Sequence, residues 1–207
     1  MKTPLYGMLC GIWQRFACLN DRFFRKNADF SSWMTQESAG FTKNHGNQYQ
    51  PTTDALVRIL KRFPISREDH ILDIGCGKGK AMYLMSRFPF GSIRGYDLSE
   101  TLTHIANDNF SRLGLEQCRA FQADALEFQD YDAYNYFYLY NPFPEEVFHV
   151  MMDHLQESLK RRPRTCIMIY LHPVCHDYIL RQTPFRLIWK KKSWIGWFDY
   201  NCYSNTP

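Results

Sequence analysis

Apolar positions in this chain follow two alternating patterns from about residue 52 onward. Short apolar runs typical of buried parallel strands are separated by segments whose apolar residues recur at helical spacing. Strands are expected near 70–74, 92–97, 119–122, 134–140 and 165–171, and helices near 52–63, 80–88, 99–113, 144–161 and 174–181. This alternation predicts an α/β fold in which helices cover both faces of a mostly parallel sheet.

The end of the chain breaks the alternation. Residues 185–189 and 197–203 have the composition of strands, and no helix separates them. They predict a hairpin that closes the sheet. The lysines at 190–192 are expected in its turn, where positive charge discourages pairing at the sheet edge. A chain of 207 residues is long enough to bury a substantial single core.

The first part of the chain has a different organisation. Apolar residues at helical spacing over 5–23 predict an amphipathic helix, which packs on the sheet or lies on a membrane surface. The apolar run is too short to cross a membrane, and no signal-peptide cleavage site follows it. Residues 29–48, rich in Ser, Gln, Asn and Gly, predict a lid-like loop. We therefore divide the chain into an N-terminal helical extension with this loop, 1–48, and a main domain, 49–207.

The strand near 70–74 runs into the turn Gly75-Cys76-Gly77-Lys78-Gly79. Glycines let such a turn approach a ligand closely, and the N–H groups of the following helix face that ligand. A dinucleotide fingerprint would need Gly or Ala where the chain has Lys80, and a phosphate-binding loop would need Gly in place of Ile74. Cys76 is interpreted as a small apolar filler and not as a nucleophile.

Two acidic residues lie at the ends of the next strands. Asp97 ends the strand near 92–97, where an ionised carboxylate can accept hydrogen bonds from ribose hydroxyls. Its alternative role is to cap the helix that begins near Ser99. Asp124 follows the third strand, and its alternative role is that of a turn or cap residue.

The glycine motif, Asp97 and Asp124, in this order, resemble the motifs of the class I S-adenosylmethionine (SAM) dependent methyltransferases, over about residues 49–171. The resemblance implies a single-domain Rossmann-like fold over 49–207, with a seven-stranded, mostly parallel sheet and an antiparallel C-terminal strand. It also implies SAM as the cofactor, with Asp97 at the ribose and Asp124 at the adenine amino group. The implied cofactor-binding residues are Asp73, Gly75, Cys76, Gly77, Gly79, Asp97, Leu98, Asp124, Ala125, Tyr49 and Thr52.

The strand near 134–140 delivers Asn141-Pro142-Phe143-Pro144, which resembles the Asn-Pro-Pro-aromatic motif of amino-methylating enzymes. In those enzymes the Asn side chain and the proline carbonyl accept hydrogen bonds from the target nitrogen, so Asn141, Pro142 and Phe143 are the implied catalytic residues. Pro144 stands where the motif has an aromatic that stacks on a planar target.

The same turn is similar to the Asn-x-Phe segment of the non-SET histone-lysine methyltransferases. These enzymes also carry an aromatic, Thr-containing segment before a helix, here 49–54, although Thr52 or Thr53 at that helix is also a candidate cap. Together the resemblances imply methyl transfer to a nitrogen, with a protein lysine or a small amine favoured. A nucleobase amino group and a non-catalytic SAM-binding module stay open as alternatives. An oxygen acceptor is disfavoured because no His or Lys general base is evident near the turn.

Cysteine and charge patterns add constraints on compartment and partners. The seven cysteines form no Cys-x-x-Cys pair, which favours a reducing, cytoplasmic compartment without stable membrane insertion. The segment 172–176 contains two His and one Cys but no second ligand pair at zinc spacing, so we expect a loop and no metal. The net charge is +4, and the basic clusters 160–164 and 190–192 are interpreted as solvated, with nucleic-acid binding as the alternative.

Overall fold

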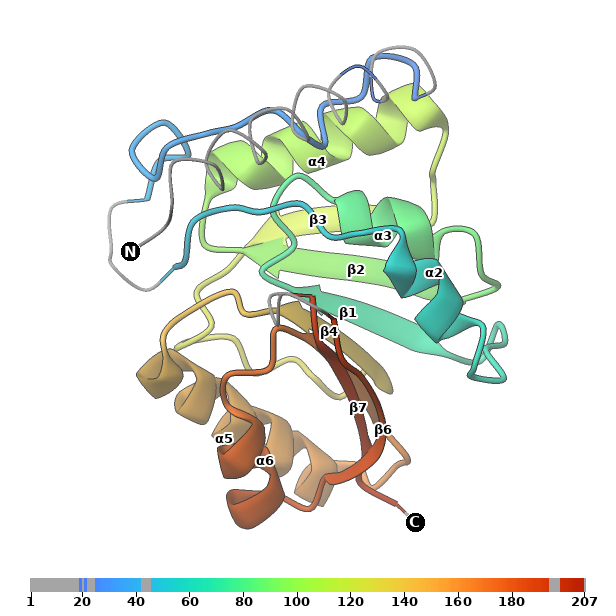
Figure 1. The fold of residues 1–207 in the computed structure, drawn as a ribbon, viewed down its shortest axis with the longest axis vertical. Helices are drawn as coiled ribbons and strands as arrows, with labels where there is room; N and C mark the ends of the chain where they lie inside the picture. The colour runs from blue at the N-terminus through green and yellow to red at the C-terminus, as the bar shows by residue number, and fades with distance from the viewer. Residues whose placement is uncertain (1–18, 20, 22–24, 42–45, 194–197, 207) are drawn as a thin grey trace.

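The computed structural model describes residues 19, 21, 25–41, 46–193 and 198–206. The amphipathic helix predicted over 5–23 lies outside these residues except for positions 19 and 21. The described part of the chain forms one sheet with helices on both sides (Figure 1).

The sheet has seven strands in the order β3-β2-β1-β4-β5-β7-β6. Strand β7 runs antiparallel to both of its neighbours, and the other neighbouring pairs are parallel. The predicted fold class is therefore confirmed. The strands are β1 His70–Ile74, β2 Ser92–Asp97, β3 Cys118–Gln122, β4 Tyr136–Tyr140, β5 Ile167–Leu171, β6 Arg186–Lys191 and β7 Tyr200–Ser204.

The helices divide between the two faces of the sheet. Their bounds are α2 Ala55–Leu60, α3 Lys80–Met85, α4 Glu100–Leu113, α5 Glu145–Arg161 and α6 His176–Gln182. Buried side chains of α2, α3 and α4 share one apolar core, and those of α5 and α6 share another. Along β1 the side chains alternate between these cores, so Ile71 belongs to the first and Leu72 to the second.

Three details differ from the sequence predictions. Helix α2 begins at Ala55, and neither threonine caps it, because its N-cap is Asp54 and no side chain fills that role. Helix α3 ends at Met85, earlier than expected. Lys190 and Lys191 do not lie in the hairpin turn but in β6, where they pair with β7 at the edge of the sheet.

The first basic cluster is held by the protein's own acceptors. Arg161 forms an ion pair of 2.9 Å with Asp132, and Arg164 donates to the carbonyls of Tyr131 and Tyr134.

Within the described ranges, no group of His, Cys, Asp and Glu side chains is arranged to hold a metal ion. The segment 172–175 is the loop between β5 and α6, as expected. No helix that the structure describes is long and apolar enough to cross a membrane.

The strand order reverses direction between β1 and β4. In open α/β sheets, ligands bind outside the carboxyl ends of the strands at such a switch point. Apart from Tyr49 and Thr52, which precede α2, the residues predicted to bind the cofactor and the acceptor lie at or just after the carboxyl ends of β1, β2, β3 and β4. The fold therefore brings four separate chain segments to one site.

Candidate functional site

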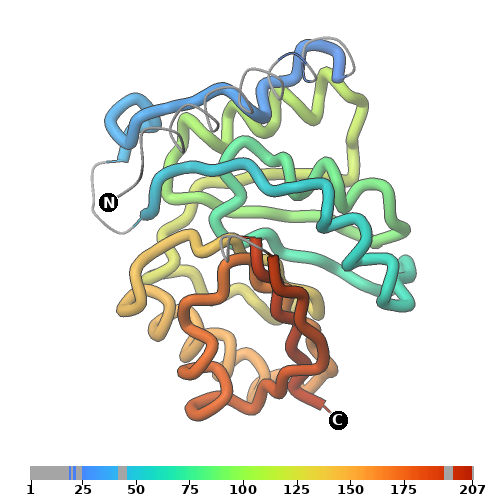
Figure 2. The backbone as a smooth tube through the Cα atoms, viewed as in Figure 1, coloured from blue at the N-terminus to red at the C-terminus, as the bar shows by residue number. Residues whose placement is uncertain are grey.

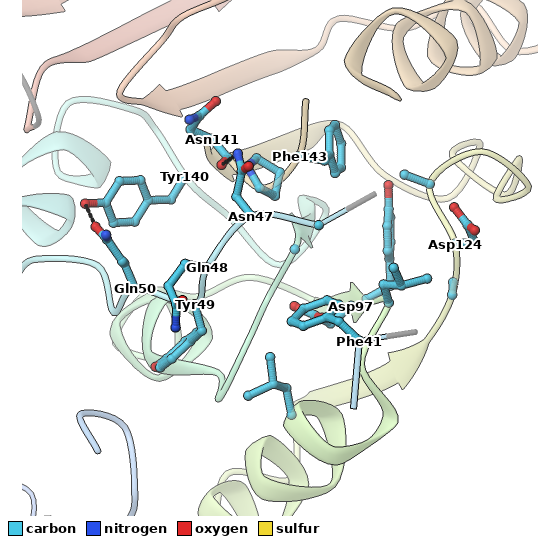
Figure 3. A pocket seen from close by; sticks show the side chains of 18 residues that line it. Phe41, Asn47, Gln48, Tyr49, Gln50, Asp97, Asp124, Tyr140, Asn141 and Phe143 are labelled. Carbon is cyan, nitrogen blue, oxygen red and sulfur yellow. Dashed lines mark hydrogen bonds between the residues drawn. The ribbon is translucent and has the colours of Figure 1, made fainter. Parts of the chain in front are cut away.

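A pocket at these strand ends contains about 610 Å³ of empty space, part of it open to solvent (Figure 3). Its lining includes nine of the residues predicted from the sequence: Tyr49, Gly75, Asp97, Leu98, Asp124, Ala125, Asn141, Pro142 and Phe143. A smaller pocket of about 260 Å³ shares Tyr49 and Gly75 and is lined in addition by Thr52, Asp73 and Cys76. Gly77 and Gly79 line neither pocket.

The first two glycines of the loop allow close contacts around the site. Both have positive φ, at 75° for Gly75 and 52° for Gly77. A Cβ atom at Gly75 would lie 2.3 Å from Pro142 Cβ, and one at Gly77 would lie 2.3 Å from the Tyr49 ring. The loop therefore seats the turn Asn141-Pro142-Phe143, called the acceptor turn for its predicted role, on Gly75 and the Tyr49 ring on Gly77.

The third glycine has a packing role. Gly79, with φ of 80°, precedes α3, and a Cβ there would lie 2.4 Å from the ring of Phe110 on α4. The neighbouring Cys76 is buried, and its burial raises the pKa of its thiol well above the usual range. A thiol held in its neutral form is a poor nucleophile, which agrees with its interpretation as a small filler.

Asp97 connects β2 to the glycine loop. One carboxylate oxygen accepts a hydrogen bond from the Gly77 N–H at 2.9 Å, and the other accepts from the Ser99 N–H at 3.0 Å. Ser99, and not Asp97, caps α4 through a bond from the Leu102 N–H. Burial raises the pKa of Asp97 to about 6, although these backbone bonds oppose the rise. Each carboxylate oxygen keeps a lone pair for a ligand hydroxyl.

Asp73 is a second buried acid beside the loop. Its side chain is 2% exposed, and its Oδ2 atom finds no hydrogen-bond partner in the part of the chain that the structure describes. Burial, and secondarily the charge of Asp97, raise its pKa well above the usual range. A buried carboxylate with an unfilled acceptor favours a cationic ligand group in the smaller pocket, which Asp73 lines.

The remaining predicted cofactor residues have mixed roles. Asp124 is half-buried at the pocket wall, and its Oδ1 also accepts from the Leu126 N–H at 3.0 Å, so it braces its own turn. The Thr52 hydroxyl is buried between the hydroxyls of Tyr138, at 2.7 Å, and Tyr200, at 3.3 Å. Thr52 thus joins the N-terminal side of the site to two strands of the sheet.

The acceptor turn follows β4 directly. Asn141 has a φ of 39°, which is uncommon for a residue other than glycine, and its Oδ1 lies 3.5 Å from the Tyr170 hydroxyl. The Phe143 ring is nearly buried in the pocket wall. In Figure 3, Asn141 lies at the end of the pocket away from Asp97 and Asp124.

The described parts of the predicted lid-like loop pack on the glycine loop and along α4 (Figure 2). Lys78 is fully buried, and its ammonium donates to Asp29 at 2.8 Å and to the Ser32 carbonyl at 3.0 Å. The Asn109 side chain bonds both the backbone of Asp29 and the Lys78 carbonyl. These contacts hold the segment against the site.

Residues 46–50 form one side of the main pocket. Asn47 donates to the carbonyls of Asn141 and Pro142, and the Tyr140 hydroxyl donates to Gln50. Of residues 46–50, only Tyr49 was predicted from the sequence to lie at the site. The polar side chains of the others resemble those of an ordinary loop, so no local signal identifies them.

The residues fit SAM. This cofactor presents two ribose hydroxyls, an adenine amino group, an ammonium group and a positively charged sulfur. Asp97 offers carboxylate acceptors to the hydroxyls, Asp124 lines the same pocket, and Asp73 has an unfilled acceptor in the adjoining pocket. Three acids around one site also favour a ligand with net positive charge.

Comparisons with known proteins agree with this geometry. Residues 71–162 match a family described as a methyltransferase domain. The chain is 29% identical over 134 residues to 27-O-demethylrifamycin SV methyltransferase of Amycolatopsis mediterranei (strain S699). That match covers 64% of this chain and 46% of the relative, so the chain spans less than half of the relative's length.

Solved structures show the same architecture. A SAM dependent methyltransferase from Aquifex aeolicus superposes with a TM-score of 0.57 at 13% identity, covering 72% of this chain and 88% of that one. A ribosomal protein L11 methylase from Lactobacillus delbrueckii subsp. bulgaricus also gives a TM-score of 0.57, at 14% identity, covering 77% and 80%. The chain therefore shares its fold with these two methyltransferases.

The matched domain, the curated relative and the fold together support a SAM-dependent methyltransferase with SAM as its cofactor. The narrower resemblance to the histone-lysine enzymes stays a prediction.

Proposed function

We propose that this protein transfers a methyl group from SAM to a nitrogen acceptor, either a lysine side chain of a protein or another amine. The observation that carries the proposal is the position of the Asn141-Pro142-Phe143 turn in the same pocket as Asp97 and Asp124. A cofactor bound by the two acids would lie beside the turn.

The cofactor side of the site would work by binding and orientation. Asp97 would accept hydrogen bonds from the ribose hydroxyls, Asp124 from the adenine amino group, and Asp73 from the ammonium group. When bound, SAM supplies a methyl group on a positively charged sulfur, which is open to displacement by a nucleophile. The chain's own contribution is to align the acceptor and exclude water, and alignment can supply a large part of the rate enhancement.

The acceptor side favours a group that is nucleophilic without a strong base. The described residues that line the main pocket include no His, Lys or Arg, and Lys80 lines the adjoining smaller pocket. An oxygen acceptor would usually need a general base beside it. A neutral amine has its own lone pair and needs hydrogen-bond acceptors to orient it. The Asn141 side chain and the Pro142 carbonyl offer such acceptors. The Asn47 N–H occupies one lone pair of the Pro142 carbonyl oxygen, and its second lone pair stays available.

One observation favours an oxygen acceptor as a second candidate. The curated relative is named for methylation of 27-O-demethylrifamycin SV. A nucleobase amino group is a weaker candidate, because Pro144 occupies the position of the stacking aromatic.

A labelling experiment would test the proposal. Purified protein, D97A and N141A would each be incubated with SAM labelled in its methyl group and a native cell extract, which is then separated into protein, nucleic acid and small molecules. We expect label in protein or small amines, lost in both variants and recovered as N-methyl groups on hydrolysis. Label recovered on oxygen would replace the nitrogen assignment. Measurable SAM binding without transfer to any fraction would favour a non-catalytic SAM-binding module.

A further inference from the structure

Asn47 is the residue outside the cofactor motifs that makes the most direct contact with the acceptor turn. Its side-chain Nδ2 donates to the Asn141 carbonyl at 2.8 Å, and its backbone N–H donates to the Pro142 carbonyl at 2.8 Å. One residue therefore binds both successive carbonyls of a turn 94 positions later in the chain. In Figure 3, Asn47 lies directly beside Asn141.

The turn that Asn47 binds has an unfavourable backbone conformation. Asn141 has φ of 39°, and such strained residues persist only where the surrounding structure fixes them. On one side, Pro142 packs so closely on Gly75 that a Cβ atom there would lie 2.3 Å away. Asn47 supplies hydrogen bonds to the same turn. The turn is thus fixed by packing and by two hydrogen bonds from a different chain segment.

We propose that Asn47 is a positioning residue, which holds the Asn141–Pro142 turn so that its acceptors face the methyl-accepting group. This inference rests on the proposed function. The Asn47 side chain satisfies the Asn141 backbone carbonyl, while the side-chain Oδ1 of Asn141 accepts one long bond of 3.5 Å from Tyr170 and keeps a lone pair for the methyl-accepting group. Without that bond, the turn can relax toward a common backbone conformation, and its acceptors lose their fixed direction.

Two SAM analogues allow a test that needs no identified acceptor. Sinefungin carries an amine in place of the sulfur-bound methyl group, so this amine reports on the hydrogen-bond acceptors at the transfer position. S-adenosylhomocysteine has the same adenosine and amino acid groups but nothing at that position. Calorimetry would give the dissociation constants of both ligands for the wild type, N47A and N47D. Aspartate retains the shape of asparagine but lacks the donor.

Q36A is the matched control, since the exposed Gln36 also donates an amide N–H to a backbone carbonyl, that of Gly46, in the same segment. We expect N47A and N47D to weaken sinefungin binding by about fivefold, the value of one ordinary hydrogen bond, with little change for S-adenosylhomocysteine. Q36A should leave the ratio of the two constants at its wild-type value. Thermal unfolding of each variant would confirm that the fold is intact.

A ratio of the two dissociation constants that stays at its wild-type value in N47A and N47D would overturn the inference. If both ligands bind more weakly by the same factor, Asn47 has a general role in the segment. Tighter sinefungin binding would also overturn the inference, because Asn47 would then compete with the acceptor. Failure of the wild type to bind S-adenosylhomocysteine would instead refute the proposed function itself.

Discussion

Replacement of Asp97 with asparagine tests two effects of this carboxylate separately: its contribution to cofactor affinity and its effect on the free energy of unfolding. The side chain is 7% exposed, and its two oxygens accept from the N–H groups of Gly77 and Ser99 at 2.9 and 3.0 Å. An asparagine has the same shape but only one acceptor oxygen. Its NH₂ group would face a backbone donor on one side, so one of these two bonds is lost.

Loss of the charge should weaken SAM binding. A hydrogen bond to a charged group contributes about 1.5–3 kcal/mol, which corresponds to about a tenfold to hundredfold change in affinity. We expect D97A and D97N to raise the dissociation constant of SAM within that range. In the wild type, the affinity should also increase as the pH rises through about 6, because the ionised carboxylate is the better acceptor. D97N should lack this dependence.

The effect on stability has the opposite direction. Burial raises the pKa of Asp97 from 3.8 to about 6, so the native state binds this proton more tightly than the unfolded chain does. The tighter binding of this proton contributes fully to the free energy of unfolding below about pH 4, and the contribution is lost as the pH rises through about 6. The difference between the two pKa values corresponds to about 3 kcal/mol. Relative to the wild type, D97N should therefore gain about 3 kcal/mol in free energy of unfolding between pH 4 and pH 7.

Urea unfolding at several pH values and calorimetric titration with SAM would measure the two effects. D108N is the control, because Asp108 is an exposed acid on α4. Unchanged SAM affinity in D97N would refute the ribose assignment. A stability difference that stays constant with pH would refute the reasoning about the buried carboxylate.

Three other substitutions test single contacts. G79A should lower the free energy of unfolding by about 3 kcal/mol, because a residue in the left-handed region gains a Cβ that would lie 2.4 Å from the Phe110 ring. Adding F110L to G79A should recover part of this loss. No recovery would contradict the contact. N141A should leave the SAM dissociation constant within about twofold of the wild type but reduce methyl transfer at least about tenfold. This difference is expected for a group that orients only the acceptor. Equal transfer by N141A and the wild type would exclude that role. T52V should lower the free energy of unfolding by about 1–2 kcal/mol in urea, since it removes a buried bond to Tyr138 at 2.7 Å, and should leave SAM affinity unchanged. A tenfold loss of affinity would show that Thr52 contacts the cofactor, as predicted from the sequence.

Local sequence signals were sufficient to predict the sheet and many of the residues that line the two pockets. The apolar run from Ile71 to Ile74 and the glycines after it identify β1 because a buried parallel strand leaves little freedom in composition. Asp97 and Asp124 were predicted for a related reason. Each follows a strand of a parallel sheet, and the carboxyl ends of such strands meet at one edge.

Residues whose roles depend on distant contacts could not be predicted in this way. Lys78 has the sequence context of a solvated loop lysine, yet it is fully buried against Asp29. Thr52 lines the smaller pocket, but the bond of its hydroxyl to Tyr138, 86 positions away, has no signal in the sequence. Asn47 has no periodic or motif signal, because its partners are backbone carbonyls that any sequence would supply. Only the folded arrangement identifies these pairs.

The glycine motif shows why a motif alone does not define a site. Its three glycines accommodate three different neighbours: Pro142 of the acceptor turn at Gly75, the Tyr49 ring at Gly77, and the Phe110 ring at Gly79. Spacing alone would assign all three to the cofactor. Since the first two also seat the Asn141–Pro142 turn and the Tyr49 ring, the loop that would hold SAM also sets the position of the proposed acceptor groups. A bulky residue at Gly75 or Gly77 should therefore disturb cofactor affinity and acceptor geometry together, whereas one at Gly79 should act mainly through the fold.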